Sequence, residues 1–128
     1  MTRVQRPVLL YDPNCRLCRF AARVVVRLDR GDRLALLPLS SEEAAPLLEP
    51  LPETERFSSW RLAEPDGTLS GRGSGARGVL RAIGLDSAAR LVEALPDAML
   101  ESTYDVVARN RGRLGRLVPD GPAPRRFP

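Results

Sequence analysis

The feature that most constrains the fold is a buried strand that leads directly into an amphipathic helix. Residues 7–11 (Pro-Val-Leu-Leu-Tyr) form a continuous apolar run, typical of a strand covered on both faces of a parallel sheet. Asp12-Pro-Asn14 supplies turn residues, and Asn14 is the expected N-cap of the helix that follows. Apolar residues from Leu17 to Leu28 recur at helical spacing, with arginines on the opposite side, and Gly31-Asp32 ends the helix. With a second strand over 33–39, this segment predicts a right-handed strand–helix–strand unit.

Turn and capping residues divide the rest of the chain into short elements. We first expect a short helix that is capped by the Ser40-Ser-Glu-Glu43 box and limited by Pro46 and Pro50. Strands over 57–63 and 68–70 follow, joined by an Asp66-Gly67 hairpin turn. The next helix is capped by Ser74 and ended by Gly84, and two more helices are expected over 87–95 and 97–113. Trp60, the only Trp, is expected in the core at the third strand.

These elements predict a single α/β domain. Their order is β-α-β-α-β-β-α, followed by a helical C-terminal extension, and it is the order of a thioredoxin-like core. With 128 residues, of which 43% are hydrophobic, the chain is long enough for one hydrophobic core. We expect the domain over residues 1–117 and an irregular tail rich in Pro and Arg over 118–128.

The basic charge of the chain lies in its C-terminal part. All 20 basic residues are Arg, and residues 109–128 hold six Arg and one Asp, an excess above the formal net charge of +4. A nucleic-acid groove usually interleaves aromatic and basic side chains, whereas this segment has only Phe127, so nucleic-acid binding is not favoured. No apolar run is long enough for a transmembrane segment or a signal sequence, and we expect a cytoplasmic protein.

Two cysteines without a histidine exclude several kinds of site. One chain cannot supply the four Cys or His ligands of a usual zinc site, and a Cys–His hydrolase needs a histidine. Cys15 and Cys18 lie three positions apart, so a bridge between them would remove little chain entropy and would not be a structural staple. In a reducing compartment such a pair indicates a redox-active or a metal-binding site, and the lack of further ligands favours the redox site. We therefore expect no cofactor and no metal.

The position of this pair at a strand–helix junction predicts thiol–disulfide exchange. The free amides of the helix N-terminus stabilise a thiolate on Cys15, and the charges of Arg16 and Arg19 act in the same direction. Cys18, one turn deeper, would resolve the mixed disulfide that Cys15 forms and leave a Cys15–Cys18 bridge. Asp12, the one acid beside the pair, either helps to deprotonate Cys18 or orders the turn as an Asx residue.

Tyr11-Asp-Pro-Asn-Cys-Arg-Leu-Cys18 resembles the opening of the DCC family of predicted thiol–disulfide oxidoreductases, in which a strand precedes Asp-x-x-Cys-x-x-Cys. Tyr104-Asp-Val-Val-Ala-Arg-Asn-Arg111 is similar to the family's C-terminal Tyr-x-x-x-Ala-Arg-Asn-Arg helix, and Gly73-Ser-Gly-Ala76 to its Gly-Ser-Asp-Ala helix start. The resemblance spans residues 7 to 117. It implies a thioredoxin-like fold and a redox activity on the two cysteines.

The chain departs from the family pattern at three places. Gly75 replaces the Asp of the Gly-Ser-Asp block, which weakens a glutaredoxin-like anchor for a glutathione backbone and leaves Ser74 and its neighbouring amides as a candidate carboxylate site. Thioredoxins place a cis-proline before the third strand. Here that position falls at Ser58–Ser59, and Pro52 lies too far upstream. A further C-terminal cysteine, frequent in the family, is missing.

Arg109, Asn110 and Arg111 admit two interpretations. In the first, they fold back to support the Asp12 turn or to contact a substrate anion. In the second, they form a solvated basic end of the helix, where positive charge is favourable to the helix dipole.

Three functions are compatible with the sequence, and we prefer the first. It is a redox enzyme whose partner is a disulfide-containing protein or a low-molecular-weight thiol, with the direction of the reaction and the oligomeric state left open. The second is a non-catalytic thioredoxin-like adaptor whose basic tail docks on an acidic partner or a membrane surface. The third is a Cys-ligated metal site shared across a dimer.

Overall fold

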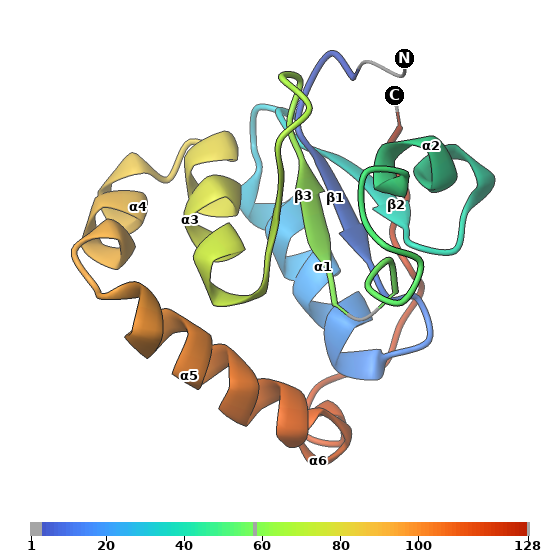
Figure 1. The fold of residues 1–128 in the computed structure, drawn as a ribbon. Helices are drawn as coiled ribbons and strands as arrows, with labels where there is room; N and C mark the ends of the chain where they lie inside the picture. The colour runs from blue at the N-terminus through green and yellow to red at the C-terminus, as the bar shows by residue number, and fades with distance from the viewer. Residues whose placement is uncertain (1–3, 58, 128) are drawn as a thin grey trace.

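A four-stranded mixed sheet lies at the centre of the molecule (Figure 1). The computed structural model describes residues 4–57 and 59–127, and for residues 72–74 it describes the backbone only. The strands are β1 (Val8–Tyr11), β2 (Ala35–Pro38), β3 (Arg61–Ala63) and β4 (Leu69–Gly71), in the spatial order β2-β1-β3-β4. β1 pairs in parallel with β2 and antiparallel with β3, and β3 pairs antiparallel with β4.

Short helices connect and cover the strands. They are η1 (Glu42–Ala44, a 3-10 helix), α1 (Arg16–Leu28), α2 (Ala45–Leu48), α3 (Arg72–Ala82), α4 (Asp86–Glu93), α5 (Asp97–Arg109) and α6 (Arg111–Gly115). The order β-α-β-α-β-β-α with a helical extension confirms the predicted thioredoxin-like α/β architecture. In the extension, α5 carries the chain from α4 to α6, which packs beside the start of α1 (Figure 1).

The side chains of β1 alternate between two apolar layers, one on each face of the sheet. Val8 and Leu10 join a buried cluster with α2, whereas Leu9 and Tyr11 join a cluster with α1 and α3. All four side chains of β1 are buried. The continuous apolar run therefore forms a strand with no polar face, as predicted, and its C-terminal end is fixed from both sides.

Three of the predicted helix caps are wrong. The N-cap of α1 is Cys15, not Asn14, because the Asn14 amide is held by the Asp12 carboxylate at 2.9 Å in a turn before the helix. The predicted capping box at Ser40–Glu43 does not form, since the N-cap is Ser41 and its hydroxyl donates to the Pro38 carbonyl at 2.8 Å. Ser74 does not cap α3, which begins at Arg72 directly after β4.

Three predicted element boundaries also need correction. Pro46 stands in the first turn of α2, which begins at Ala45, and its missing amide costs nothing there, so it does not limit the helix. The third strand begins only at Arg61, and the half-buried Trp60 precedes it. The helix expected over 97–113 is interrupted at Asn110, whose side-chain amide donates to the Val106 carbonyl at 2.7 Å and ends α5.

A glycine in α3 allows this helix to approach Trp60 closely. A Cβ atom on the buried Gly75 would lie 2.7 Å from Cη2 of the Trp60 ring. The Asp that the family pattern has at this position would therefore collide with the indole. Gly75 is thus a packing requirement in this chain.

Gly75→Ala is expected to lower the free energy of unfolding by about 1–2 kcal/mol, because overpacking outweighs the gain in helix propensity. Urea unfolding followed by circular dichroism measures this loss. Gly112→Ala is the matched control: its Cβ would meet nothing within 4 Å, and the change should leave stability equal or slightly higher. An increase in stability for Gly75→Ala would contradict the packing argument.

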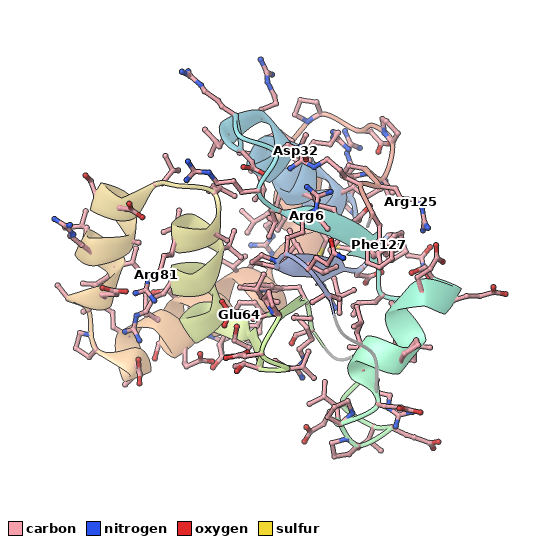
Figure 2. The ribbon with its side chains drawn as sticks, turned by 90° about the horizontal axis from the view of Figure 1, so that it is seen from above. Arg6, Asp32, Glu64, Arg81, Arg125 and Phe127 are labelled. Atoms are coloured by element: carbon pink, nitrogen blue, oxygen red, sulfur yellow. The ribbon has the colours of Figure 1, made fainter. Side chains whose placement is uncertain are left out.

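The C-terminal tail covers the exposed edge of β2. After α6 the described residues form no helix or strand, but Arg126 makes an antiparallel bridge with Leu36, with N···O distances of 2.9 and 2.7 Å. The Arg126 guanidinium pairs with the buried Asp29 at 2.5 Å, and Phe127 packs against the apolar cluster on the α2 side. Figure 2 shows Phe127 and Arg125 at the same end of the molecule as Arg6 and Asp32.

The tail also runs along the arginine side of α1. Arg16 donates to the Val118 carbonyl at 2.8 Å, and Arg23 donates to the carbonyls of Pro119 and Pro122 at 2.9 and 3.0 Å. The face of α1 that the sequence pattern assigns to solvent is therefore a binding surface for the chain's own C-terminus.

Arg126→Ala is expected to destabilise the protein by about 2–3 kcal/mol, because it leaves the buried carboxylate of Asp29 without its cationic partner. Arg125→Ala provides the control, since the Arg125–Glu43 pair is exposed and such pairs contribute up to about 1 kcal/mol. Chemical unfolding compares the two variants. Equal losses would show that the tail is not anchored through Asp29.

Candidate functional site

Cys15 and Cys18 lie at the N-terminus of α1, at the end of the buried strand β1. Cys15 has extended backbone geometry as the N-cap, and the Cys18 amide donates to its Sγ at 3.3 Å. The sulfur of Cys15 thus takes the place that a hydroxyl or carboxylate oxygen has in a common helix cap. Both cysteines are free thiols and both are half-buried.

The two thiols differ in their electrostatic surroundings. Burial raises the pKa of the Cys18 thiol to about 12, and a hydrogen bond with the Cys15 side chain and the charges of Cys15 and Asp12 act in the same direction. Arg111 lowers this pKa. At neutral pH Cys18 is therefore a protonated thiol, held beside the sulfur of Cys15.

The loop before the cysteines is an Asx turn. The Asp12 carboxylate accepts the Asn14 amide at 2.9 Å, and the Asp12 carbonyl accepts the Cys15 amide at 3.5 Å. This geometry accounts for one of the two roles predicted for Asp12. The charge of Asp12 also helps to raise the pKa of the Cys18 thiol.

Arg19 binds this loop through the Pro13 carbonyl, a contact that the sequence analysis did not predict. Its guanidinium donates to the Pro13 carbonyl at 2.9 Å, pairs with Asp120 at 2.8 Å and donates to the Gly121 carbonyl at 3.2 Å. The sequence indicates only a charge near the cysteines. Two of the partners lie about a hundred positions away in the tail, so no local spacing signals them.

An open pocket of about 370 Å³ adjoins Cys15. We call it the Cys15 pocket; it is lined by Asp12, Asn14, Cys15 and Arg16 on one side and by Arg111, Gly112, Gly115 and Arg116 of the C-terminal extension on the other. The structure thus brings together five of the predicted site residues, and Arg111 does fold back toward the cysteines. Arg116 was not predicted.

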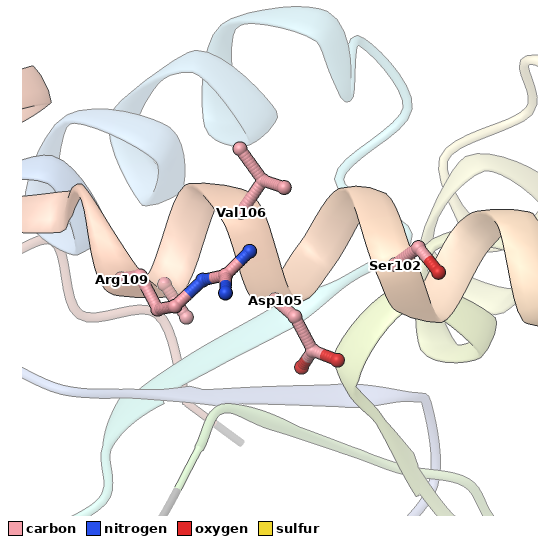
Figure 3. Close-up of a pocket in the computed structure, with 5 residues that line it drawn as sticks. Ser102, Asp105, Val106 and Arg109 are labelled. Atoms are coloured by element: carbon pink, nitrogen blue, oxygen red, sulfur yellow. The ribbon is translucent and has the colours of Figure 1, made fainter.

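The other residues of the predicted Arg109–Arg111 block lie elsewhere. Arg109 lines a separate open pocket along α5, together with Ser102, Asp105, Val106 and Ala108 (Figure 3). Figure 3 shows Asp105 and Val106 projecting from opposite sides of this helix. The Asn110 side chain binds its own helix through the Val106 carbonyl. Neither Arg109 nor Asn110 lines the Cys15 pocket.

The remaining predicted positions lie around β3 and α3. The Ser74 side chain and Ser58 lie outside the part of the chain that the structure describes. Ser59 is buried, and its hydroxyl donates to the Trp60 carbonyl at 3.3 Å.

Within residues 4–57 and 59–127, no three side chains of Cys, Asp or Glu gather in a group that would hold a metal ion. No helix in the same ranges combines the length and the apolar character that crossing a membrane requires.

Comparison with known proteins agrees with the geometry at the two cysteines. The model of one family, described as DCC1-like thiol-disulfide oxidoreductase, matches residues 9–117. The searches of curated proteins and of solved structures gave no match. The family match covers most of the chain and includes the cysteine pair and the extension that faces it, which supports a redox role. The chain belongs to the DCC1-like thiol-disulfide oxidoreductase family.

Proposed function

We propose that this protein is a dithiol–disulfide oxidoreductase in which Cys15 is the nucleophile and Cys18 the resolving thiol. The observation that carries the proposal is the hydrogen bond from the Cys18 amide to Cys15 Sγ at the start of α1. The sulfur therefore lies at the helix N-terminus with a backbone N–H directed at it, and the thiolate is the form of a cysteine that attacks disulfides. Cys15 also lines an open pocket, so a substrate disulfide has access to it.

The environment of Cys18 suits the second step. While Cys15 is a thiolate, its charge and its hydrogen bond help to raise the pKa of Cys18, which therefore keeps its proton. Once Cys15 enters a mixed disulfide, both of these contributions to the pKa are lost. Cys18 then loses its proton more readily, attacks the Cys15 sulfur and closes the Cys15–Cys18 bridge.

Asp12 is the proposed support of this chemistry. Its carboxylate orders the turn through the Asn14 amide, and it lies near enough to Cys18 to act on its pKa. It is therefore also the proposed acceptor of the Cys18 proton.

The contacts of the C-terminal tail bear on the adaptor alternative. That hypothesis needs basic tail residues free to dock on a partner, but Arg125 is paired with Glu43 and Arg126 with Asp29. The redox function is therefore the better supported of the two. A reducing compartment, for which we propose the cytoplasm, would keep both thiols available.

The first test is equilibration of the purified protein in glutathione redox buffers, with the thiols then alkylated and counted by mass. We expect a reversible two-electron transition between dithiol and Cys15–Cys18 disulfide. Its midpoint, compared with about −270 mV for thioredoxin, gives the direction of the reaction. Cys15→Ser should abolish the transition. A wild-type protein that forms no intramolecular disulfide at any buffer ratio would refute the proposal.

A second test uses the raised pKa of Cys18. At pH 8 a thiol with a pKa of about 12 is thiolate in roughly one molecule in ten thousand, so iodoacetamide should modify Cys15 and spare Cys18 in the folded protein. The rate at Cys18 should rise about tenfold per pH unit between pH 7 and pH 9. Peptide mass mapping measures both sites, and unfolding in urea should make them equally reactive.

Cys15→Ala is the matched variant for this second test. It removes the charge and the hydrogen bond of Cys15, two of the causes that raise the pKa of Cys18, while the burial remains. Alkylation of Cys18 should therefore be faster than in the wild type, though still slower than in the unfolded chain. Unchanged or slower alkylation would show that the two thiols are not coupled.

A further inference from the structure

The Cys15 pocket carries an excess of positive charge. Arg16, Arg111 and Arg116 line it, and the one acid in the lining is Asp12, whose carboxylate already accepts the Asn14 amide. The charge of Arg111 reaches the cysteines, because it lowers the pKa of Cys18. A molecule that approaches Cys15 through this pocket therefore meets guanidinium groups.

Arg111 and Arg116 differ from several other arginines of the fold in what they contact. Arg19, Arg77 and Arg126 are each paired with a carboxylate, at 2.8, 2.6 and 2.5 Å. Over the ranges that the structure describes, neither Arg111 nor Arg116 makes an ion pair or a hydrogen bond through its side chain. Their charge is therefore available to a ligand.

Contact between α6 and the start of α1 places the backbone of Arg111 and Arg116 beside the cysteines. Gly115 is buried in this contact, and a Cβ atom on it would already lie 3.6 Å from the Arg16 Cβ and from the Leu17 amide nitrogen. Arg16 is itself held by the Val118 carbonyl, at 3.1 Å from Nε and 2.8 Å from the second guanidinium nitrogen. Both sides of the pocket thus belong to ordered elements.

We propose that the Cys15 pocket selects small disulfides that carry carboxylate groups, with Arg111 and Arg116 binding the carboxylate. The inference rests on the proposed function and names the substrate class of the same site. A volume of about 370 Å³ lies within the range of small-molecule sites, so the pocket suits one half of a small disulfide. Guanidinium groups match carboxylates in shape and charge, which gives the pocket its preference for anions.

The reaction consumes one disulfide and the two protein thiols. The Cys15 thiolate attacks one sulfur of the bound disulfide, forms the mixed disulfide and releases the first carboxylated thiolate, which takes up a proton. Cys18 gives up its proton and attacks the Cys15 sulfur, which releases the second thiolate. The protein is oxidised by two electrons to the Cys15–Cys18 bridge, and the substrate is reduced to two thiols.

The test measures single-turnover oxidation of the reduced protein by three small disulfides of different charge. They are dithiodipropionate (anionic), bis(hydroxyethyl) disulfide (neutral) and cystamine (cationic), and acid quench with alkylation follows the reaction. Each rate constant is divided by the rate constant for the reaction of dithiothreitol with the same disulfide. This ratio removes the intrinsic difference in reactivity among the three disulfides. At low ionic strength we expect the normalised rate to be about tenfold higher for the anion than for the neutral compound, and lowest for the cation.

Variants separate the pocket from the general charge of the protein. Arg111→Gln and Arg116→Gln should each lower the ratio of the anionic to the neutral normalised rate about threefold to tenfold. Arg113→Gln is the matched control, because Arg113 lies on the same helix α6 but does not line the pocket, and it should change neither rate by more than about twofold.

Two results would overturn the inference while the proposed function stands. One is an equal normalised rate for the anionic and the neutral disulfide. The other is an effect of Arg113→Gln as large as that of Arg111→Gln, which would reflect long-range attraction and not binding in the pocket. If none of the disulfides, including the neutral one, oxidises the cysteine pair, the proposed oxidoreductase function is refuted, and the proposed substrate class is refuted as well.

Discussion

Burial of β1 on both faces is the constraint on which the rest of the structure depends. Val8 and Leu10 pack toward α2 while Leu9 and Tyr11 pack toward α1 and α3, so the strand has no freedom to shift in register. The chain leaves this strand through the Asp12 turn and enters α1 at Cys15. The cysteine that receives the helix amide is thus placed by the most buried element of the fold.

Interactions that hold the polar side of α1 come from the other end of the chain. Arg16, Arg19 and Arg23 form the polar side of an amphipathic helix, and a periodic pattern assigns such a side to water. They instead donate to carbonyls of the tail, while Arg126 bridges to the edge strand and pairs with Asp29. A tail rich in Pro suits this role, because it offers carbonyl acceptors and has few amides of its own to satisfy.

The difference between local patterns and contacts from the distant C-terminal tail explains how much of the structure the sequence predicts. The strands, the helices and the cysteine pair at their junction follow from local periodicity and turn residues, and nearly all of these elements form as expected. The caps fail where a neighbouring contact competes, as when Asp12 holds the Asn14 amide and the helix begins one residue later. The place of Arg116 in the pocket and the tail contacts of Arg19 were missed because they depend on segments about a hundred residues apart, which no local pattern encodes.

The C-terminal extension completes the site chemically as well as structurally. Burial and the neighbouring charges of Cys15 and Asp12 all oppose ionisation of Cys18, which would leave a resolving thiol that reacts slowly. Arg111 is the group that acts against them, and it comes from the extension. Since the same arginine lines the Cys15 pocket, a carboxylate bound there, as we propose, would partly neutralise it and so weaken its action on Cys18. The charge that favours a carboxylate in this pocket is therefore also a charge that favours ionisation of Cys18.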